Sequence, residues 1–114
     1  NGLIQARNLM RSSKQGIPER KHAVDAFVFA WRSEIREHFD DEERLLLPLC
    51  SRPALGEQLL AEHRVLRALA ECCEREPDVI AADTGLVQRV GRLLNDHIRW
   101  EERVFFEALQ DDQP

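Results

Sequence analysis

The chain has 114 residues, a formal net charge of -5 and three cysteines. This length suits one domain with its own hydrophobic core, so we expect residues 1–114 to form a single domain, and the missing initiator Met is compatible with a start inside a longer protein. The acidic balance argues against a nucleic-acid surface, and the lack of an apolar run of about 18 residues argues against a membrane span. An odd number of cysteines favours reduced thiols, and hence a cytoplasmic protein, over a disulfide framework.

Helical periodicity continues through most of the chain with few interruptions. Gly16 and Pro18 separate the first two helices, because Gly suits a left-handed cap and Pro suits a first helical turn. Pro48 closes the second helix, Ser51 is expected to cap the third, and Pro77 ends it before a loop of about six residues. The expected helices cover about residues 2–14, 19–47, 52–76 and 84–110. Four helices with short connections predict an all-α, up-down-up-down antiparallel four-helix bundle.

The motif His-x-x-x-Glu-Glu-Arg occurs twice, beginning at His38 and at His97. In an α-helix the His and the Glu four residues later share one face, so each copy pairs an imidazole with a carboxylate. Such a pair is usually solvated, but here Glu42 and Glu101 fall with their histidines on the apolar stripes of their helices. Buried carboxylates need a cation or a raised pKa, because an unpaired charge in a core is costly. The repeat therefore predicts a metal held between two helices.

His63 lies on the inward stripe of the third helix. A lone His on an apolar face is more often a core residue than a ligand, but its register changes that interpretation. The last loop centres near residue 80, so His63 and His97 are each about 17 residues from it and lie at a similar height. Five side chains are therefore expected to converge on one layer of the core: His38, Glu42, His63, His97 and Glu101.

Other polar residues are expected to lie outside this layer. His22 precedes His38 on the same predicted helix by about 24 Å of axial rise, so we assign it to an exposed position near the helix start. Glu43 and Glu102, the second Glu of each motif, fall off the stripes and are expected to be solvated. On the first helix, the position opposite His38 falls before Asn1, so any fourth imidazole would lie upstream.

These residues resemble the hemerythrin-like family, also called the HHE cation-binding domain. The matching features are His38 with Glu42, His63, and His97 with Glu101, on the second to fourth helices. The resemblance implies a four-helix bundle in which Glu42 and Glu101 bridge two iron ions. It also implies that His38 is a terminal ligand of one iron and that His63 and His97 are terminal ligands of the other. The additional third-helix His of oxygen carriers is missing, so the chain looks more like the bacterial sensing, storage or iron-repair relatives.

We therefore expect a non-haem di-iron module that binds O2, NO or a related small oxidant, for sensing, buffering or scavenging. Mn or Zn would also suit these ligands, so iron rests on the resemblance. A di-iron enzyme that reduces NO or peroxide, or supports iron repair, is an alternative, although the other inward positions offer no proton donor. These positions are Trp31, Ile35, Leu66, Leu94 and Phe105. A metal-free interaction bundle is a second alternative, and it leaves five polar groups in an apolar layer unexplained.

Overall fold

The computed structural model describes residues 1–112, which form helices and turns and contain no β-strand. The α-helices are α1 (Gly2–Ser12), α2 (Ile17–Ala30), α3 (Arg36–Asp41), α4 (Pro53–Arg75), α5 (Pro77–Ala82), α6 (Thr84–Trp100) and α7 (Phe106–Asp111). Three π-helical turns, η1 (Trp31–Ile35), η2 (Glu42–Leu46) and η4 (Glu101–Phe105), and the 3-10 turn η3 (Leu47–Leu49) continue these helices. A bilayer crossing would need a longer apolar helix than any that the described residues form.

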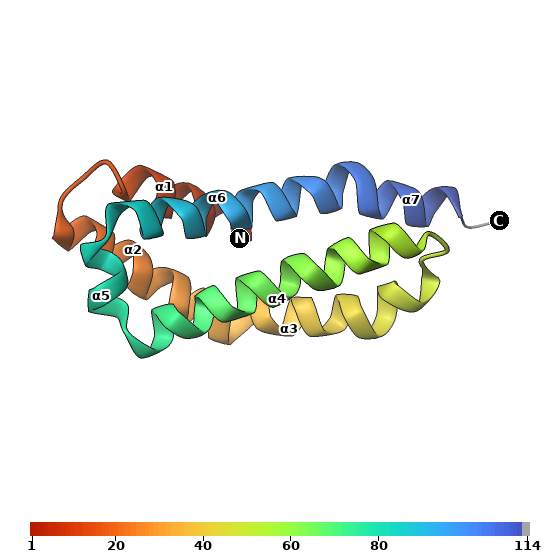
Figure 1. Ribbon diagram of the computed structural model, residues 1–114, viewed down its shortest axis with the longest axis horizontal. Helices are drawn as coiled ribbons and strands as arrows, with labels where there is room; N and C mark the ends of the chain where they lie inside the picture. The colour runs from red at the N-terminus through yellow and green to blue at the C-terminus, as the bar shows by residue number, and fades with distance from the viewer. Residues whose placement is uncertain (113–114) are drawn as a thin grey trace.

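The helices build an elongated antiparallel bundle that measures 51 × 22 × 20 Å. In Figure 1, α2 and α3 run end to end along the bundle, α4 returns beside them, and α6 and α7 run back again. The first helix, α1, packs against α6 and α2 and covers only the half of the bundle that contains α5. The predicted all-α antiparallel bundle is confirmed, with four helices side by side at one end and α3, α4 and α7 at the other.

The predicted second helix is continuous, but it is not a regular α-helix. In η1 the backbone N–H of Arg36 donates to the carbonyl of Trp31, five residues earlier. A π-turn contains an extra residue, which rotates the following side chains by about 100°. The inward stripe therefore passes from Trp31 to Ile35 and then to Phe39, which is only 3% exposed. His38, which was predicted to face inward, is exposed instead.

The segment after Pro77 was predicted to be a loop, and this prediction is wrong for most of its length. Pro77 occupies the first turn of α5, where its missing N–H is not needed. Ile80 and Ala81 bury their side chains, and Arg20 of α2 donates from Nε to the Ala81 carbonyl at 2.6 Å. This short helix therefore closes the end of the bundle against α2.

The predicted capping role of Ser51 is also wrong. Its hydroxyl donates to Asp112 Oδ2 at 2.6 Å, and α4 begins at Pro53 without a side-chain cap. The start of α4 is thus tied to the end of α7. A capping bond does occur at the start of α6, where Asp83 accepts from the backbone N–H of Leu86 at 3.1 Å.

The hydrophobic core consists of two apolar clusters. The larger one fills the half of the bundle that α1 covers, and the smaller one is built on Leu59, Phe105 and Leu109 at the opposite end. On α4, His63 lies between Leu59 of the smaller cluster and Leu66 of the larger cluster. The polar residues therefore form a layer between two apolar regions. The five apolar positions predicted to face inward are all buried: Trp31, Ile35, Leu66, Leu94 and Phe105.

Candidate metal centre

Four ligand-type side chains meet in the polar layer. They are Glu42, His63, His97 and Glu101, and one nitrogen or oxygen of each lies within 4.8 Å of those of the others. His63 and His97 come from α4 and α6, whereas each glutamate is the first residue of a π-turn. The same π-turn occurs at the same place in both copies of the repeated motif. The structure thus brings together four of the five residues that the sequence placed in this layer.

The ligand atoms of this cluster are buried without hydrogen-bond partners. The unpartnered atoms are Glu42 Oε1, His63 Nε2, His97 Nε2 and Glu101 Oε2. Nε2 of His63 lies 3.1 Å from Glu42 Oε1, and Nε2 of His97 lies 3.1 Å from Glu101 Oε1, without the alignment of a hydrogen bond. A buried unsatisfied polar group costs about 1–3 kcal/mol, and a cation that accepts these lone pairs would remove that cost. Two imidazoles and two carboxylates suit Fe, Mn or Zn, so the donor set fits a metal.

The pKa values of the two carboxylates of the cluster are shifted in opposite directions. Burial raises the pKa of Glu101 to about 8; His97 opposes this rise and Glu42 adds to it. Burial would also raise the pKa of Glu42, but its interactions with His63 and Glu101 hold that pKa below its usual range. Burial would lower the pKa of His97, which lies 3.1 Å from Glu101, but its two carboxylate neighbours raise that pKa. In the metal-free protein this pair therefore holds a proton more tightly than either group would in water, whereas Glu42 favours its ionised form.

Metal binding is expected to displace the proton of Glu101, because a carboxylate must be ionised to bind a cation. The affinity for Zn²⁺, which has no redox chemistry, should fall by up to about tenfold for each pH unit below about pH 8, and level off above it. Competition titrations against a chromophoric chelator at several pH values would measure this dependence. A flat profile between pH 6 and pH 8 would mean that Glu101 is ionised before the metal arrives.

A further carboxylate contacts Nδ1 of each buried imidazole, the ring nitrogen on the far side from the cluster. Nδ1 of His63 lies 2.6 Å from Glu43 Oε2, and Nδ1 of His97 lies 2.7 Å from Glu62 Oε1. Glu43 also accepts from Arg67 Nη1 at 2.7 Å. The prediction that Glu43 is solvated is therefore wrong, and Glu62 carried no signal in the sequence. Both contacts join different helices, so periodicity within one helix could not have found them.

Phe39 packs directly against both histidines. Its ring is stacked on the His63 ring, with centroids 3.9 Å apart and an interplanar angle of 3°. It also meets the His97 ring edge to face at 5.4 Å, and Trp31 contacts it in the same manner at 5.4 Å. Nothing in the sequence pattern singled out Phe39, because a regular α-helix would have turned His38 inward in its place.

His38 lies beside the cluster but is not part of it. It is exposed and lines a pocket of about 260 Å³ together with Glu42 and Glu101. Its other lining residues include apolar ones, such as Ile35 and Leu94, and three polar ones, Asn1, Glu34 and Glu102. This pocket therefore reaches the two carboxylates of the cluster, and the ligand role of His38 stays a prediction.

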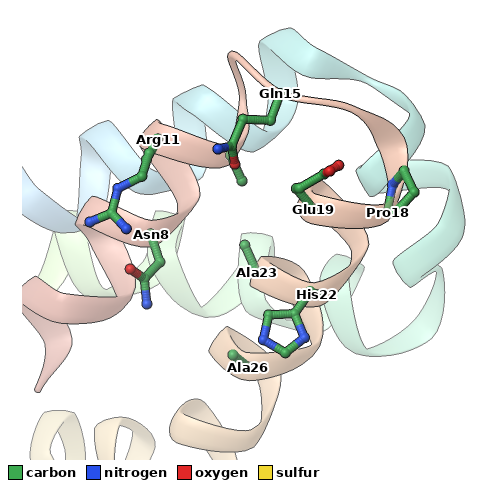
Figure 2. Close-up of a pocket in the computed structure, with 9 residues that line it drawn as sticks. Asn8, Arg11, Gln15, Pro18, Glu19, His22, Ala23 and Ala26 are labelled. Atoms are coloured by element: carbon green, nitrogen blue, oxygen red, sulfur yellow. The ribbon is translucent and has the colours of Figure 1, made fainter.

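His22 occupies a separate site, as predicted. It is exposed and lines a pocket of about 470 Å³ between α1 and α2. Figure 2 shows His22 of α2 and Asn8 of α1 on either side of this pocket. None of the four clustered ligand residues lines it.

Replacing His22 with alanine is expected to leave the metal content unchanged, because this imidazole contacts no residue of the cluster. The free energy of unfolding should change by no more than about 0.5 kcal/mol, as is usual for an exposed position. Elemental analysis and chemical denaturation of the variant and the wild type would check both expectations. Loss of metal from this variant alone would contradict the assignment of the cluster.

Comparison with known proteins identifies one match. A family model described as the hemerythrin HHE cation binding domain matches residues 2–109, which include all four residues of the cluster. Comparisons with curated proteins and with solved structures gave no match.

Proposed function

The chain belongs to the hemerythrin HHE cation-binding family, and from this premise we propose that it holds a non-haem di-iron centre that binds O2, NO or a related small oxidant. Family membership and the clustered His and Glu residues make it a metal-binding protein. The observation that supports the proposal most directly is the set of four buried ligand atoms without partners. We also propose a cytoplasmic location, which the three free cysteines support, since thiols persist in a reducing compartment.

The residues of the cluster would share the ions between them. His63 and His97 would each contribute Nε2, and the two glutamates have enough oxygens to bridge two ions. The imidazole of His38, at the edge of the adjoining pocket, would serve the ion on that side. Five side chains cannot fill the five or six positions that each iron prefers, so some positions would stay open to a small ligand.

The pocket beside the carboxylates determines what reaches those positions. It has a volume of about 260 Å³ and is lined in part by Phe39, Leu94 and Phe106. The apolar part of this lining favours small uncharged gases over bulky molecules, and the pocket also contains the carboxylates of Glu34 and Glu102. Bound ferrous ions would supply electrons to such an oxidant, while the side chains hold it and limit the access of water.

The test is to load the protein with ferrous iron under anaerobic conditions and then add O2 or NO. We expect metal analysis to find bound iron and the spectrum to gain visible absorption within the mixing time. Protein that takes up no iron would contradict the metal assignment. Bound iron whose spectrum is unchanged by both gases would identify a storage or structural site instead.

A di-iron reductase of NO or peroxide is the second candidate, and one observation favours it. The predicted inward positions lack proton donors, but His38, Glu34 and Glu102 line the pocket that reaches the two carboxylates of the cluster. These side chains can carry protons to a reacting molecule. Consumption of many equivalents of NO or peroxide per protein in the presence of a reductant would support the enzyme, whereas a single equivalent would support the binding protein.

A further inference from the structure

Each clustered histidine lies between two carboxylates, one on either ring nitrogen. For His63 the distances are 2.6 Å from Nδ1 to Glu43 and 3.1 Å from Nε2 to Glu42. For His97 they are 2.7 Å from Nδ1 to Glu62 and 3.1 Å from Nε2 to Glu101. The pattern is the same although the two histidines come from different helices.

A neutral imidazole has one N–H, and its position decides whether the ring can bind a metal. We call the glutamate near Nε2 the inner one (Glu42 or Glu101) and the glutamate near Nδ1 the outer one (Glu43 or Glu62). A proton on Nε2 would point at the inner glutamate and leave no lone pair on that nitrogen for a cation. A proton on Nδ1 would point at the outer glutamate and leave Nε2 free. In both rings only the outer contact is a hydrogen bond, whereas Nε2 has no hydrogen-bond partner. The outer carboxylates therefore favour the tautomer that binds metal.

The two outer carboxylates, Glu43 and Glu62, differ in the other donors that they accept from, and therefore in how strongly they accept from the imidazole. Glu43 also accepts from Arg67 at 2.7 Å, and Arg67 is held in turn by Asp40 at 2.8 Å. Glu62 accepts from the neutral amide of Gln58 at 2.8 Å and has no Lys or Arg partner within residues 1–112. A carboxylate shared with a guanidinium is a weaker acceptor for a second donor.

We propose that Glu43 and Glu62 are positioning residues that fix the tautomers of His63 and His97, and that Arg67 makes His63 the weaker ligand of the two. The proposal rests on the metal-binding function proposed above. A carboxylate that accepts the Nδ1 proton of a ligand histidine both fixes the ring orientation and raises the basicity of the other nitrogen. The unshared Glu62 raises the basicity of His97 more than the shared Glu43 raises that of His63.

Zinc affinity is the first measurement, because Zn²⁺ binds imidazole and carboxylate without redox chemistry. Mutating such an outer carboxylate typically weakens metal binding by about 10–100-fold. Glu62→Gln keeps an acceptor but removes the charge that raises the basicity of His97, so its loss should fall in that range, and Glu43→Gln should lose less. Arg67→Gln should raise the affinity, since it frees Glu43 for His63. Glu57→Gln and Glu37→Gln remove the same charge from exposed positions on α4 and α3 and should leave the affinity unchanged.

The tautomers are the second measurement, and they can be read in the metal-free protein. Imidazole ¹⁵N NMR at alkaline pH should show both clustered histidines protonated at Nδ1. Glu62→Ala should move the proton of His97 to Nε2, because the outer acceptor is gone and Glu101 remains near that nitrogen. Glu62→Gln keeps an acceptor oxygen and should retain the wild-type tautomer, which separates positioning from a general effect of the substitution on folding.

Each outcome has a definite meaning. Wild-type rings protonated at Nε2, or a Glu62→Gln protein that binds Zn²⁺ as tightly as the Glu57→Gln control, would overturn the proposal. Equal losses for Glu43→Gln and Glu62→Gln, together with no gain for Arg67→Gln, would overturn the role of Arg67. If the wild type binds no Zn²⁺ and no iron, the proposed function fails, and the NMR measurement still decides the tautomers.

Discussion

Replacing Glu42 and Glu101 together with glutamine is expected to abolish tight metal binding while making the metal-free protein more stable. The double variant keeps the shape of both side chains but removes the two charges that a cation needs. Without metal, the charge of Glu101 is costly, since burial raises the pKa of Glu101 to about 8, whereas His63 helps to stabilise the charge of Glu42. The folded protein therefore loses stability as the pH rises from about 4.5, the ordinary pKa of a glutamate, to about 8, and the loss levels off above that value. Removing the buried charge of Glu101 should raise the free energy of unfolding by about 1–3 kcal/mol above pH 8.

Two measurements check this opposite effect on binding and stability. Elemental analysis after anaerobic iron loading should find iron in the wild type and none in the double variant. Urea denaturation of the metal-free proteins above pH 8 should then rank the variant above the wild type. A matched control replaces Glu34 and Glu102, two exposed carboxylates of the adjoining pocket, and should change neither result. Equal iron in both proteins would contradict the assigned centre.

Replacing Phe39 with alanine is expected to destabilise the protein by about 3–5 kcal/mol, the range for a buried aromatic residue. The ring is 3% exposed, and its loss would leave a cavity beside both imidazoles. His63 would lose its stacking partner and His97 would lose its edge-to-face contact. The positions of their Nε2 atoms would therefore be less well defined. Metal affinity should therefore fall as well, although Phe39 contributes no ligand atom.

Chemical denaturation and Zn²⁺ titration of three variants would test this role. Phe29→Ala makes the same change at a residue that is 74% exposed, and it should alter stability by no more than about 0.5 kcal/mol. Phe39→Leu keeps most of the volume and should recover part of the stability, but less of the metal affinity, because leucine cannot stack on an imidazole. Equal effects of the two alanine variants would show that Phe39 does not order the site.

The sequence by itself determined the number and order of the long helices and the family. Apolar residues at helical spacing and the Gly and Pro residues between them act locally, so they can be read without a partner helix. The repeated motif marked Glu42 and Glu101, and the equal distances of His63 and His97 from one loop placed them at one height. The structure brings one ligand atom of each of these four residues within 4.8 Å of those of the others.

Only the tertiary structure decided which side chain of the second helix faces the site. The π-turn η1 adds a residue to a helix whose composition gives no sign of it, and the rotation buries Phe39 and exposes His38. A π-turn is tolerated where packing on neighbouring helices compensates for its poorer geometry, which is information that the local sequence lacks. The ligand role of His38 consequently stays a prediction, although the motif that contains it was the strongest signal in the chain.

The tertiary structure also decided which carboxylates contact Nδ1 of the two buried histidines. Glu43 and Glu62 look like ordinary surface residues of amphipathic helices, since each lies next to an inward residue. Their contacts with His63 and His97 span 20 and 35 residues of sequence and form only where α4 packs against η2 and α6. Hydrogen bonds between helices depend on the rotation and axial offset of both, and helical periodicity describes only one helix at a time.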